Sequence, residues 1–246
     1  MAAANPLRIL VIDDDAVMTE LLSAVLGMHG HHVVTAGSGE AALALLPGES
    51  FDVVLTDLQL PGLRGHALAT ALRSALVTSG TGTRLLGMSG SEPSKRELSA
   101  FDAFLLKPFT AEQFAEAAAG SSTTPAFKLP AAESGPSPLD EAIVARLAKQ
   151  LPQAKLKELL QLTLSDARMR LDLIQRAMDA GDLDTVRREA HAIKGGTGMV
   201  GATELHQMAA KAENAATAGS AQDTPALEDF YAACVRLERM LNTRFS

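Results

Sequence analysis

The sequence contains no tryptophan, one tyrosine and a single cysteine, Cys234, among its 246 residues. A lone cysteine excludes a disulfide within the chain, so the fold does not depend on disulfide cross-links and suits a reducing compartment. No apolar run approaches the roughly 20 residues that span a membrane, so we expect no membrane insertion. Because the first apolar run already starts at Leu7, we also expect no signal peptide and a cytoplasmic protein.

Basic residues are scarce as well. The chain has 22 Lys and Arg against 29 Asp and Glu, a net charge of −7, and no basic cluster. It therefore lacks the electrostatic footprint of a nucleic-acid binder, and we expect no nucleic-acid partner. A glycine-rich loop of the kind that cradles nucleoside triphosphates is also missing, so no kinase catalytic domain is predicted.

The chain changes character near its middle. Residues 1–119 alternate short β-rich runs with helical stretches, whereas residues 139–246 contain no convincing strand. Between them, residues 120–138 are rich in Ser, Pro, Gly and Ala, which is typical of an exposed linker. The sequence thus predicts two domains, an α/β domain at 1–119 and an all-α helical bundle at 139–246.

Five apolar runs in the first part predict a doubly wound, five-stranded parallel sheet. The strands are expected near residues 7–12, 32–36, 52–56, 83–88 and 102–106. The helices between them are expected near residues 15–28, 38–46, 65–77, 93–100 and 110–119. Right-handed crossovers would then bury the sheet between two layers of helices.

Acidic residues follow two of these strands directly. Asp13 and Asp14 come after the first strand and Asp57 after the third. The carboxyl ends of parallel strands meet at one edge, where three carboxylates would repel one another unless they hold a hard cation such as Mg²⁺. The fourth and fifth strands lead to Ser89 and Lys107, which add a hydroxyl and an ammonium group at this edge.

In the second part, the segment His191-Ala-Ile-Lys-Gly-Gly sets a histidine beside a cation on a helix that is expected to begin near Asp182. At roughly 100° per residue, Lys194, Gly195 and Gly198 lie within about 60° of His191. An outward imidazole beside bare backbone leaves room for an incoming group, and Lys194 can neutralise an anion on the ring. This pattern predicts a phosphorylatable histidine, although a lone histidine on a helix is more often simply solvated.

Apolar stripes predict two further helices of the bundle. The longest is expected at 152–180 and carries Leu156, Leu160, Leu164, Leu171, Ile174 and Met178 at spacings of three, four and seven. A final helix is predicted by Leu227, Phe230, Val235, Leu237 and Met240. Such stripes are core seams rather than cofactor sites.

The order of acidic pair, single acid, hydroxyl and lysine, each after its own strand, resembles the receiver domain of two-component response regulators. The resemblance covers about residues 6–119 and includes the loop Asp57-Leu-Gln-Leu-Pro-Gly-Leu-Arg-Gly65. It implies a flavodoxin-like fold and identifies Asp57 as the phosphoacceptor.

The resemblance also implies roles for the neighbouring residues. Asp13 and Asp14 would hold Mg²⁺ together with Asp57, while Ser89 would contact the phosphoryl oxygens and Lys107 would pair with the acyl phosphate. Ser89 and Phe104 occupy the switch positions of the family. A phenylalanine lacks the hydroxyl of the tyrosine found in other members, so a hydrogen bond from that ring is not expected to transmit the signal.

The segment beginning at His191 resembles the motif of histidine phosphotransfer (HPt) domains. The resemblance covers roughly residues 139–246 and includes Gly201, ten residues on, followed by an apolar helix. It implies that His191 carries a phosphoryl group, with Lys194 beside it. Arg187 and Arg188 lie one turn before His191, where they are solvated, steer an acidic partner or contact the phosphate directly.

Together these resemblances imply a phosphorelay intermediate whose partners are a separate sensor histidine kinase, other receiver domains, or both. A linker of 19 residues, 120–138, would span about 25 Å and let the two sites of one chain meet. Two alternatives stay open. The chain could be a phosphorylation-controlled binding switch, including one that forms a homodimer through the receiver, or a phosphate sink.

Overall fold

The computed structural model divides into two compact units, Met1–Leu129 and Pro130–Ser246. The division falls outside the part of the chain that the structure describes, and so do most of the predicted linker and residues 95, 96 and 98 of the helix predicted near 93–100. The described residues are 5–78, 82–90, 93–94, 97, 99–107, 109–120 and 138–245.

The first unit is built on a five-stranded parallel sheet with the order β2-β1-β3-β4-β5. Every predicted strand is found, with its ends shifted by no more than one residue. Both faces of the sheet are covered, and all five residues of β3 are therefore buried. The strands are β1 (Arg8–Ile12), β2 (His32–Ala36), β3 (Val53–Asp57), β4 (Arg84–Ser89) and β5 (Ala103–Leu106).

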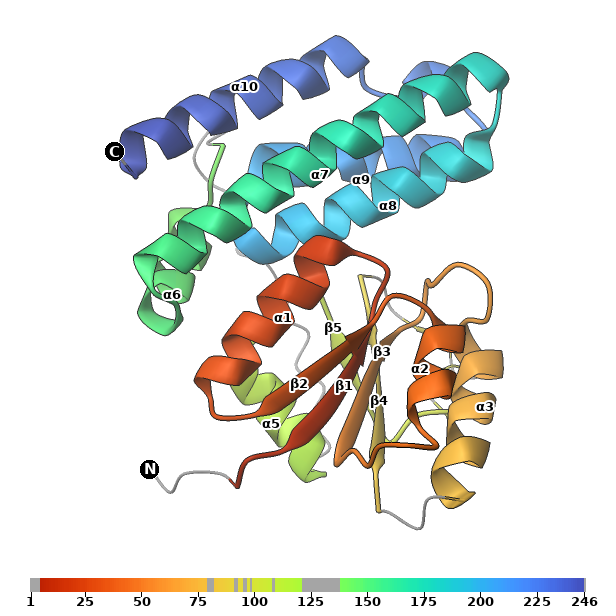
Figure 1. Cartoon of the computed structure of the whole chain (residues 1–246). Helices are drawn as coiled ribbons and strands as arrows, with labels where there is room; N and C mark the ends of the chain where they lie inside the picture. The colour runs from red at the N-terminus through yellow and green to blue at the C-terminus, as the bar shows by residue number, and fades with distance from the viewer. Residues whose placement is uncertain are drawn as a thin grey trace. The chain divides into compact units, whose positions relative to one another are not determined.

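Helices cover both faces of this sheet, with α1 and α5 on one face and α2 and α3 on the other (Figure 1). Their starts follow from the sequence. The side chain of Asp15 accepts hydrogen bonds at the start of α1, and Thr110 forms a capping box with Gln113 at the start of α5. This arrangement confirms the doubly wound, flavodoxin-like fold. The helices are α1 (Ala16–Met28), α2 (Gly39–Leu45), α3 (Gly65–Thr78) and α5 (Ala111–Ala119).

The second unit is helical and confirms the predicted bundle (Figure 1). Gly181 and Gly201 end two of its helices in the left-handed conformation, with φ of 71° and 79°, so each chain reversal takes only two residues. The elements are α6 (Glu141–Gln150), α7 (Gln153–Ala180), α8 (Leu183–Val200), α9 (Thr203–Thr217), a short 3₁₀ helix (Ala221–Asp223) and α10 (Leu227–Arg244).

The predicted apolar stripe of α7 is buried from Leu156 to Ile174. Of the five residues that predicted α10, only Phe230 and Leu237 are buried, whereas Leu227 and Met240 are half-buried. Val235 is 39% exposed, whereas its neighbour Cys234 is fully buried, because Cys234 stands three and four residues from other core positions. Burial raises the pKa of the Cys234 thiol to about 11. Within the described residues, none of the helices has the combination of length and apolar character needed to cross a membrane.

Candidate functional site

Asp13, Asp57 and Lys107 meet at the carboxyl edge of the sheet of the first unit. The Nζ atom of Lys107 lies 2.8 Å from Oδ2 of Asp13 and 2.9 Å from Oδ2 of Asp57. All three side chains are at most 7% exposed. The predicted convergence of these residues is therefore present, and a single ammonium group bridges two buried carboxylates.

The electrostatics of this cluster favour the charged form of Lys107 and disfavour the charged form of Asp13. Burial lowers the pKa of Lys107, but attraction by Asp13 and Asp57 outweighs burial and leaves the pKa raised. Burial raises the pKa of Asp13; Lys107 opposes this rise, and repulsion by Asp57 and Asp15 adds to it. Two carboxylates facing one ammonium leave an excess of negative charge on oxygen ligands, which suits a hard divalent cation.

Asp14 does not join this buried pair. Its side chain is exposed, whereas Asp15 is buried and accepts hydrogen bonds from the first turn of α1. Within the described residues, no three His, Cys, Asp or Glu side chains are grouped so as to hold a metal ion. Because Mg²⁺ keeps several waters, one or two carboxylates can suffice. The role of Asp14 as a metal ligand stays a prediction.

The two residues predicted to occupy switch positions, Ser89 and Phe104, are both buried. Ser89 lies at the end of β4, and its carbonyl accepts a hydrogen bond of 2.8 Å from the backbone N–H of Lys107. The ring of Phe104 packs directly on the backbone of Gly87 in the neighbouring strand, where a Cβ would lie 2.8 Å from two ring carbons. Phe101 meets the same ring edge-on. Gly87 thus provides the space in which Phe104 is buried.

In the second unit, Glu213 of α9 bridges His191 and Lys194 of α8. Its Oε1 atom is 2.6 Å from Nδ1 of His191, and its Oε2 atom is 2.5 Å from Nζ of Lys194. Burial raises the pKa of Glu213, but the hydrogen bonds from His191 and Lys194 lower it by more than burial raises it. The pKa of Glu213 is therefore lowered to about 2. Because an ionised carboxylate only accepts, Nδ1 of His191 carries the proton. No described residue donates to or accepts from Nε2, so its lone pair is available.

Glu213 was not predicted, because 22 residues and a helix reversal separate it from His191. Two other expectations need qualification. Arg188 pairs with Glu189 at 3.2 Å and Arg187 lies 3.9 Å from Asp184, so acidic neighbours partly neutralise the two arginines that were expected to be solvated, to steer an acidic partner or to contact the phosphate directly.

The space beside His191 that was predicted at Gly198 is also occupied. The ring of His206 covers Gly198, and a Cβ at this glycine would lie 2.8 Å from the ring. The prediction that Gly198 leaves room for an incoming group is therefore wrong, since its missing side chain accommodates a neighbouring helix.

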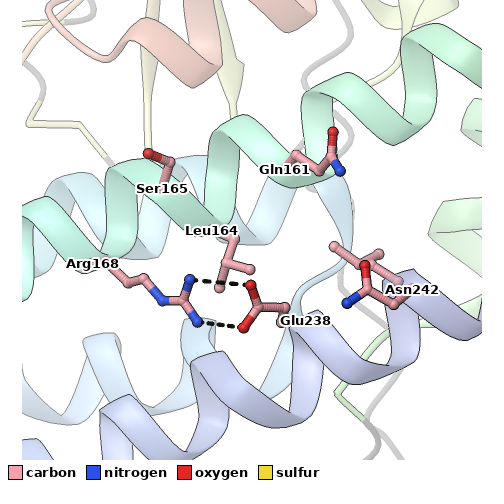
Figure 2. A pocket seen from close by; sticks show the side chains of 7 residues that line it. Gln161, Leu164, Ser165, Arg168, Glu238 and Asn242 are labelled. Carbon is pink, nitrogen blue, oxygen red and sulfur yellow. Dashed lines mark hydrogen bonds and ion pairs between the residues drawn. The ribbon is translucent and has the colours of Figure 1, made fainter.

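A pocket in the second unit lies away from this site. Figure 2 shows it between α7 and α10, where Arg168 and Glu238 pair across the seam at 2.8 Å. None of its lining residues belongs to the cluster of His191, Lys194 and Glu213, which lies between α8 and α9. The lining residues are Gln161, Leu164, Ser165, Arg168, Glu238, Leu241 and Asn242.

Comparison with known families matches residues 9–119 to the response regulator receiver domain and residues 158–243 to the Hpt domain. These two ranges contain every residue of the two clusters described above.

Several curated proteins are similar to the chain. The virulence sensor protein BvgS of Bordetella parapertussis is 32% identical over 237 residues, which covers 90% of this chain and 19% of BvgS. The sensory/regulatory protein RpfC of Xanthomonas campestris pv. campestris is 25% identical over 215 residues, covering 83% of this chain and 30% of RpfC. The chain therefore spans only about a fifth to a third of the length of these relatives.

Among solved structures, the response regulator TrrA of Thermotoga maritima, determined with Mg²⁺ and BeF, is 28% identical. The match covers 44% of this chain and 93% of TrrA, with a TM-score of 0.40.

Proposed function

Since this chain joins a response regulator receiver domain to an Hpt domain, we propose that it is a phosphorelay intermediate that accepts a phosphoryl group on Asp57 and carries one on His191. The observation that carries the proposal is the presence of two complementary acceptors in one chain. Asp57 is a buried carboxylate neutralised by Lys107, and His191 has its Nδ1 proton fixed by Glu213 and its Nε2 atom available.

At the receiver, an oxygen of Asp57 would attack the phosphorus of a phosphohistidine in line. The new P–O bond forms as the P–N bond breaks, and the electron pair returns to the departing imidazole nitrogen. Lys107, held charged between two carboxylates, would stabilise the oxygens of the transferring group. Asp13 and Asp57, with the predicted help of Asp14, would hold Mg²⁺. When bound, this ion would neutralise phosphoryl charge.

At the Hpt domain, the lone pair of Nε2 of His191 would attack the phosphorus of an acyl phosphate. The P–O bond to the carboxylate then breaks, and the ring gains positive charge. Glu213 would stabilise that charge through Nδ1–H, and Lys194 stands one turn away to meet the phosphoryl oxygens. The same residues serve both directions of transfer.

The partners in this proposal are a sensor histidine kinase, other receiver domains, or both, because a receiver aspartate and an Hpt histidine each exchange a phosphoryl group with the other kind of acceptor. Dimer formation through the receiver stays an alternative route by which a phosphorylated receiver could act.

The test is to incubate the purified protein with Mg²⁺ and acetyl phosphate and to map acid-labile and alkali-labile phosphate. We expect both kinds in the wild type, only alkali-labile phosphate in His191→Ala and neither in Asp57→Ala. Phosphate confined to Asp57 in the wild type would contradict internal relay and favour a binding switch. Rapid loss of phosphate from Asp57 as the dominant flux would favour a phosphate sink.

A further inference from the structure

We propose that His206 of α9 is a positioning residue for the phosphotransfer site of the second unit. In this inference His206 fixes the backbone of Lys194, and Lys194 and Glu213 in turn orient the imidazole of His191. The inference rests on the proposed function, because it assigns a role in the site where His191 carries the phosphoryl group.

The first observation is a hydrogen bond from a side chain to a helix backbone. Nδ1 of His206 lies 2.8 Å from the carbonyl oxygen of Lys194. A carbonyl only accepts, so Nδ1 carries the proton and the bond fixes one tautomer of the ring. The hydroxyl of Thr197 approaches the same carbonyl at 3.4 Å, a longer and weaker contact. His206 is therefore the stronger of these two side-chain anchors on this carbonyl.

The second observation is the close approach of the ring to α8. A Cβ at Gly198 would lie 2.8 Å from Nδ1 and 3.1 Å from Cε1 of His206. Real Cβ atoms do not approach other atoms so closely, so only glycine allows the ring to rest on the helix backbone here. Gly198 and His206 thus form one matched contact between α8 and α9.

The third observation is the spacing of the contacts. His191 and Gly198 are seven residues apart on α8, and His206 and Glu213 are seven residues apart on α9. Seven residues of helix are two turns, or about 10.5 Å, so both pairs stand on one face of their helix. α8 and α9 are joined by a two-residue reversal. We call the two contacts between them, Glu213 with His191 and His206 with Gly198, the two ends of one clamp.

Lys194 belongs to both ends of this clamp. Its side chain binds Glu213, and its backbone carbonyl binds His206. If the His206 contact is lost, the backbone of Lys194 gains freedom, and Glu213 no longer has a fixed ammonium on its second oxygen. The carboxylate then loses its fixed position against Nδ1 of His191.

The charge of His206 agrees with this role. Burial lowers its pKa, the hydrogen bond to the Lys194 carbonyl raises it, the charge of Lys194 lowers it, and Glu213 raises it, with a net lowering. The ring is therefore neutral near neutral pH. A neutral ring anchors the backbone without competing with Lys194 for Glu213.

Two substitutions in the full chain separate the hydrogen bond from the bulk of the ring. His206→Asn keeps a donor close to the position of Nδ1, whereas His206→Leu keeps apolar bulk and loses the donor. Gly198→Ala displaces the ring by a different route and serves where the leucine variant does not fold. The matched control is Gln207→Leu, at the exposed neighbouring position of α9.

The primary measurement is the tautomer of His191, read from imidazole ¹⁵N chemical shifts at pH 7. We expect the Nδ1–H form in the wild type, in His206→Asn and in the control, and a mixture of tautomers in His206→Leu and Gly198→Ala. The second measurement is the rate at which phosphate placed on Asp57 by acetyl phosphate appears on His191. It should fall about fivefold to tenfold in the two disrupted variants, as expected for loss of one positioning hydrogen bond.

An unchanged His191 tautomer and an unchanged transfer rate in His206→Leu, with only a lower melting temperature, would overturn the inference and reduce His206 to a packing residue. The tautomer measurement needs no phosphate. If the wild type forms no phosphohistidine, the proposed function fails while the role of His206 is still decided by the ¹⁵N shifts.

Discussion

At the scale of single residues, the two sites use opposite charge arrangements. In the receiver, the ammonium of Lys107 lies between two carboxylates, whereas in the Hpt domain the carboxylate of Glu213 lies between an imidazole and an ammonium. Each bridging group is largely buried. Removal of its charge therefore leaves the charges of its partners buried and uncompensated, which lowers stability. Both bridges can therefore be tested by a single substitution.

We predict that Lys107→Met destabilises the receiver and makes its stability depend on Mg²⁺. Without the ammonium, Asp13 and Asp57 face each other uncompensated, which should lower the unfolding free energy by about 3 kcal/mol. Millimolar Mg²⁺ should restore part of this loss, because the ion supplies the missing positive charge. Urea unfolding with and without Mg²⁺ measures both effects.

The control for this prediction is Lys155→Met, which removes a lysine whose partner, Glu158, is exposed. It should change the unfolding free energy by less than about 0.5 kcal/mol. If Lys107→Met were equally mild, or insensitive to Mg²⁺, the cluster would not have the charge imbalance described here.

The pKa of Glu213 predicts a second effect at the residue scale. Its pKa falls from the ordinary 4.5 to about 2 on folding, so the unfolded chain binds more protons between these values. The contribution of Glu213 to stability is therefore complete above about pH 4.5 and is lost as the pH falls toward about 2. The difference in unfolding free energy between the wild type and Glu213→Gln should shrink over this range.

Glu228→Gln, at an exposed position near the start of α10, is the control variant for this comparison. The same Glu213→Gln variant should also transfer phosphate to His191 about tenfold more slowly, since a neutral amide stabilises the imidazolium less than a carboxylate does. A pH-independent difference between Glu213→Gln and the wild type would contradict the depressed pKa.

At the scale of helices and strands, two glycines mark where neighbouring elements touch. Gly87 of β4 receives the ring of Phe104 from β5, and Gly198 of α8 receives the ring of His206 from α9. In both cases the aromatic ring and the glycine lie in neighbouring elements, β5 and β4 in the first case and α9 and α8 in the second. The sequence shows the glycines but not what fills the space beside them.

We predict that Gly87→Ala lowers the stability of the receiver by about 1–3 kcal/mol. The added methyl group would lie 2.8 Å from the Phe104 ring and 3.2 Å from the Phe101 ring, so the aromatic pair must shift. Gly27→Ala is the matched control, because nothing lies within 4 Å of its added methyl group. Since Gly27 is in a helix, alanine should leave stability unchanged or raise it by about 0.5 kcal/mol.

Chemical denaturation of the two variants, followed by far-ultraviolet circular dichroism, compares them directly. Equal behaviour of Gly87→Ala and Gly27→Ala would show that Phe104 has room to move without cost. A shift of Phe104 should also appear in the aromatic region of the NMR spectrum of Gly87→Ala alone.

At the scale of the whole chain, what the sequence could predict follows from how local each signal is. Strands such as β1 and helices such as α7 were predicted closely, because apolar runs and stripes are local consequences of burial. The convergence of Asp13, Asp57 and Lys107 was also predictable, since parallel strands deliver their carboxyl ends to one edge.

Contacts across a helix pair were not predictable in the same way. Glu213 and His206 meet α8 only because the Gly201 reversal sets the register of α9, and a shift of one residue would turn them through about 100°. The exposure of Asp14 and the inward turn of Asp15 were missed for a related reason, because both acids stand at a helix start that either could cap.

The last prediction concerns transfer between the two units of one chain. The predicted linker of 19 residues, 120–138, would give an effective concentration on the order of millimolar when docking is unobstructed. The first-order rate of phosphohistidine formation should then stay constant from about 1 to about 100 μM protein.

A mixture of Asp57→Ala and His191→Ala chains at about 10 μM should form phosphohistidine on the order of a hundredfold more slowly than the wild type. Wild type mixed with the double variant Asp57→Ala, His191→Ala controls for dilution. Complementation as fast as the wild type, with a rate that rises with concentration, would instead assign transfer to encounters between chains.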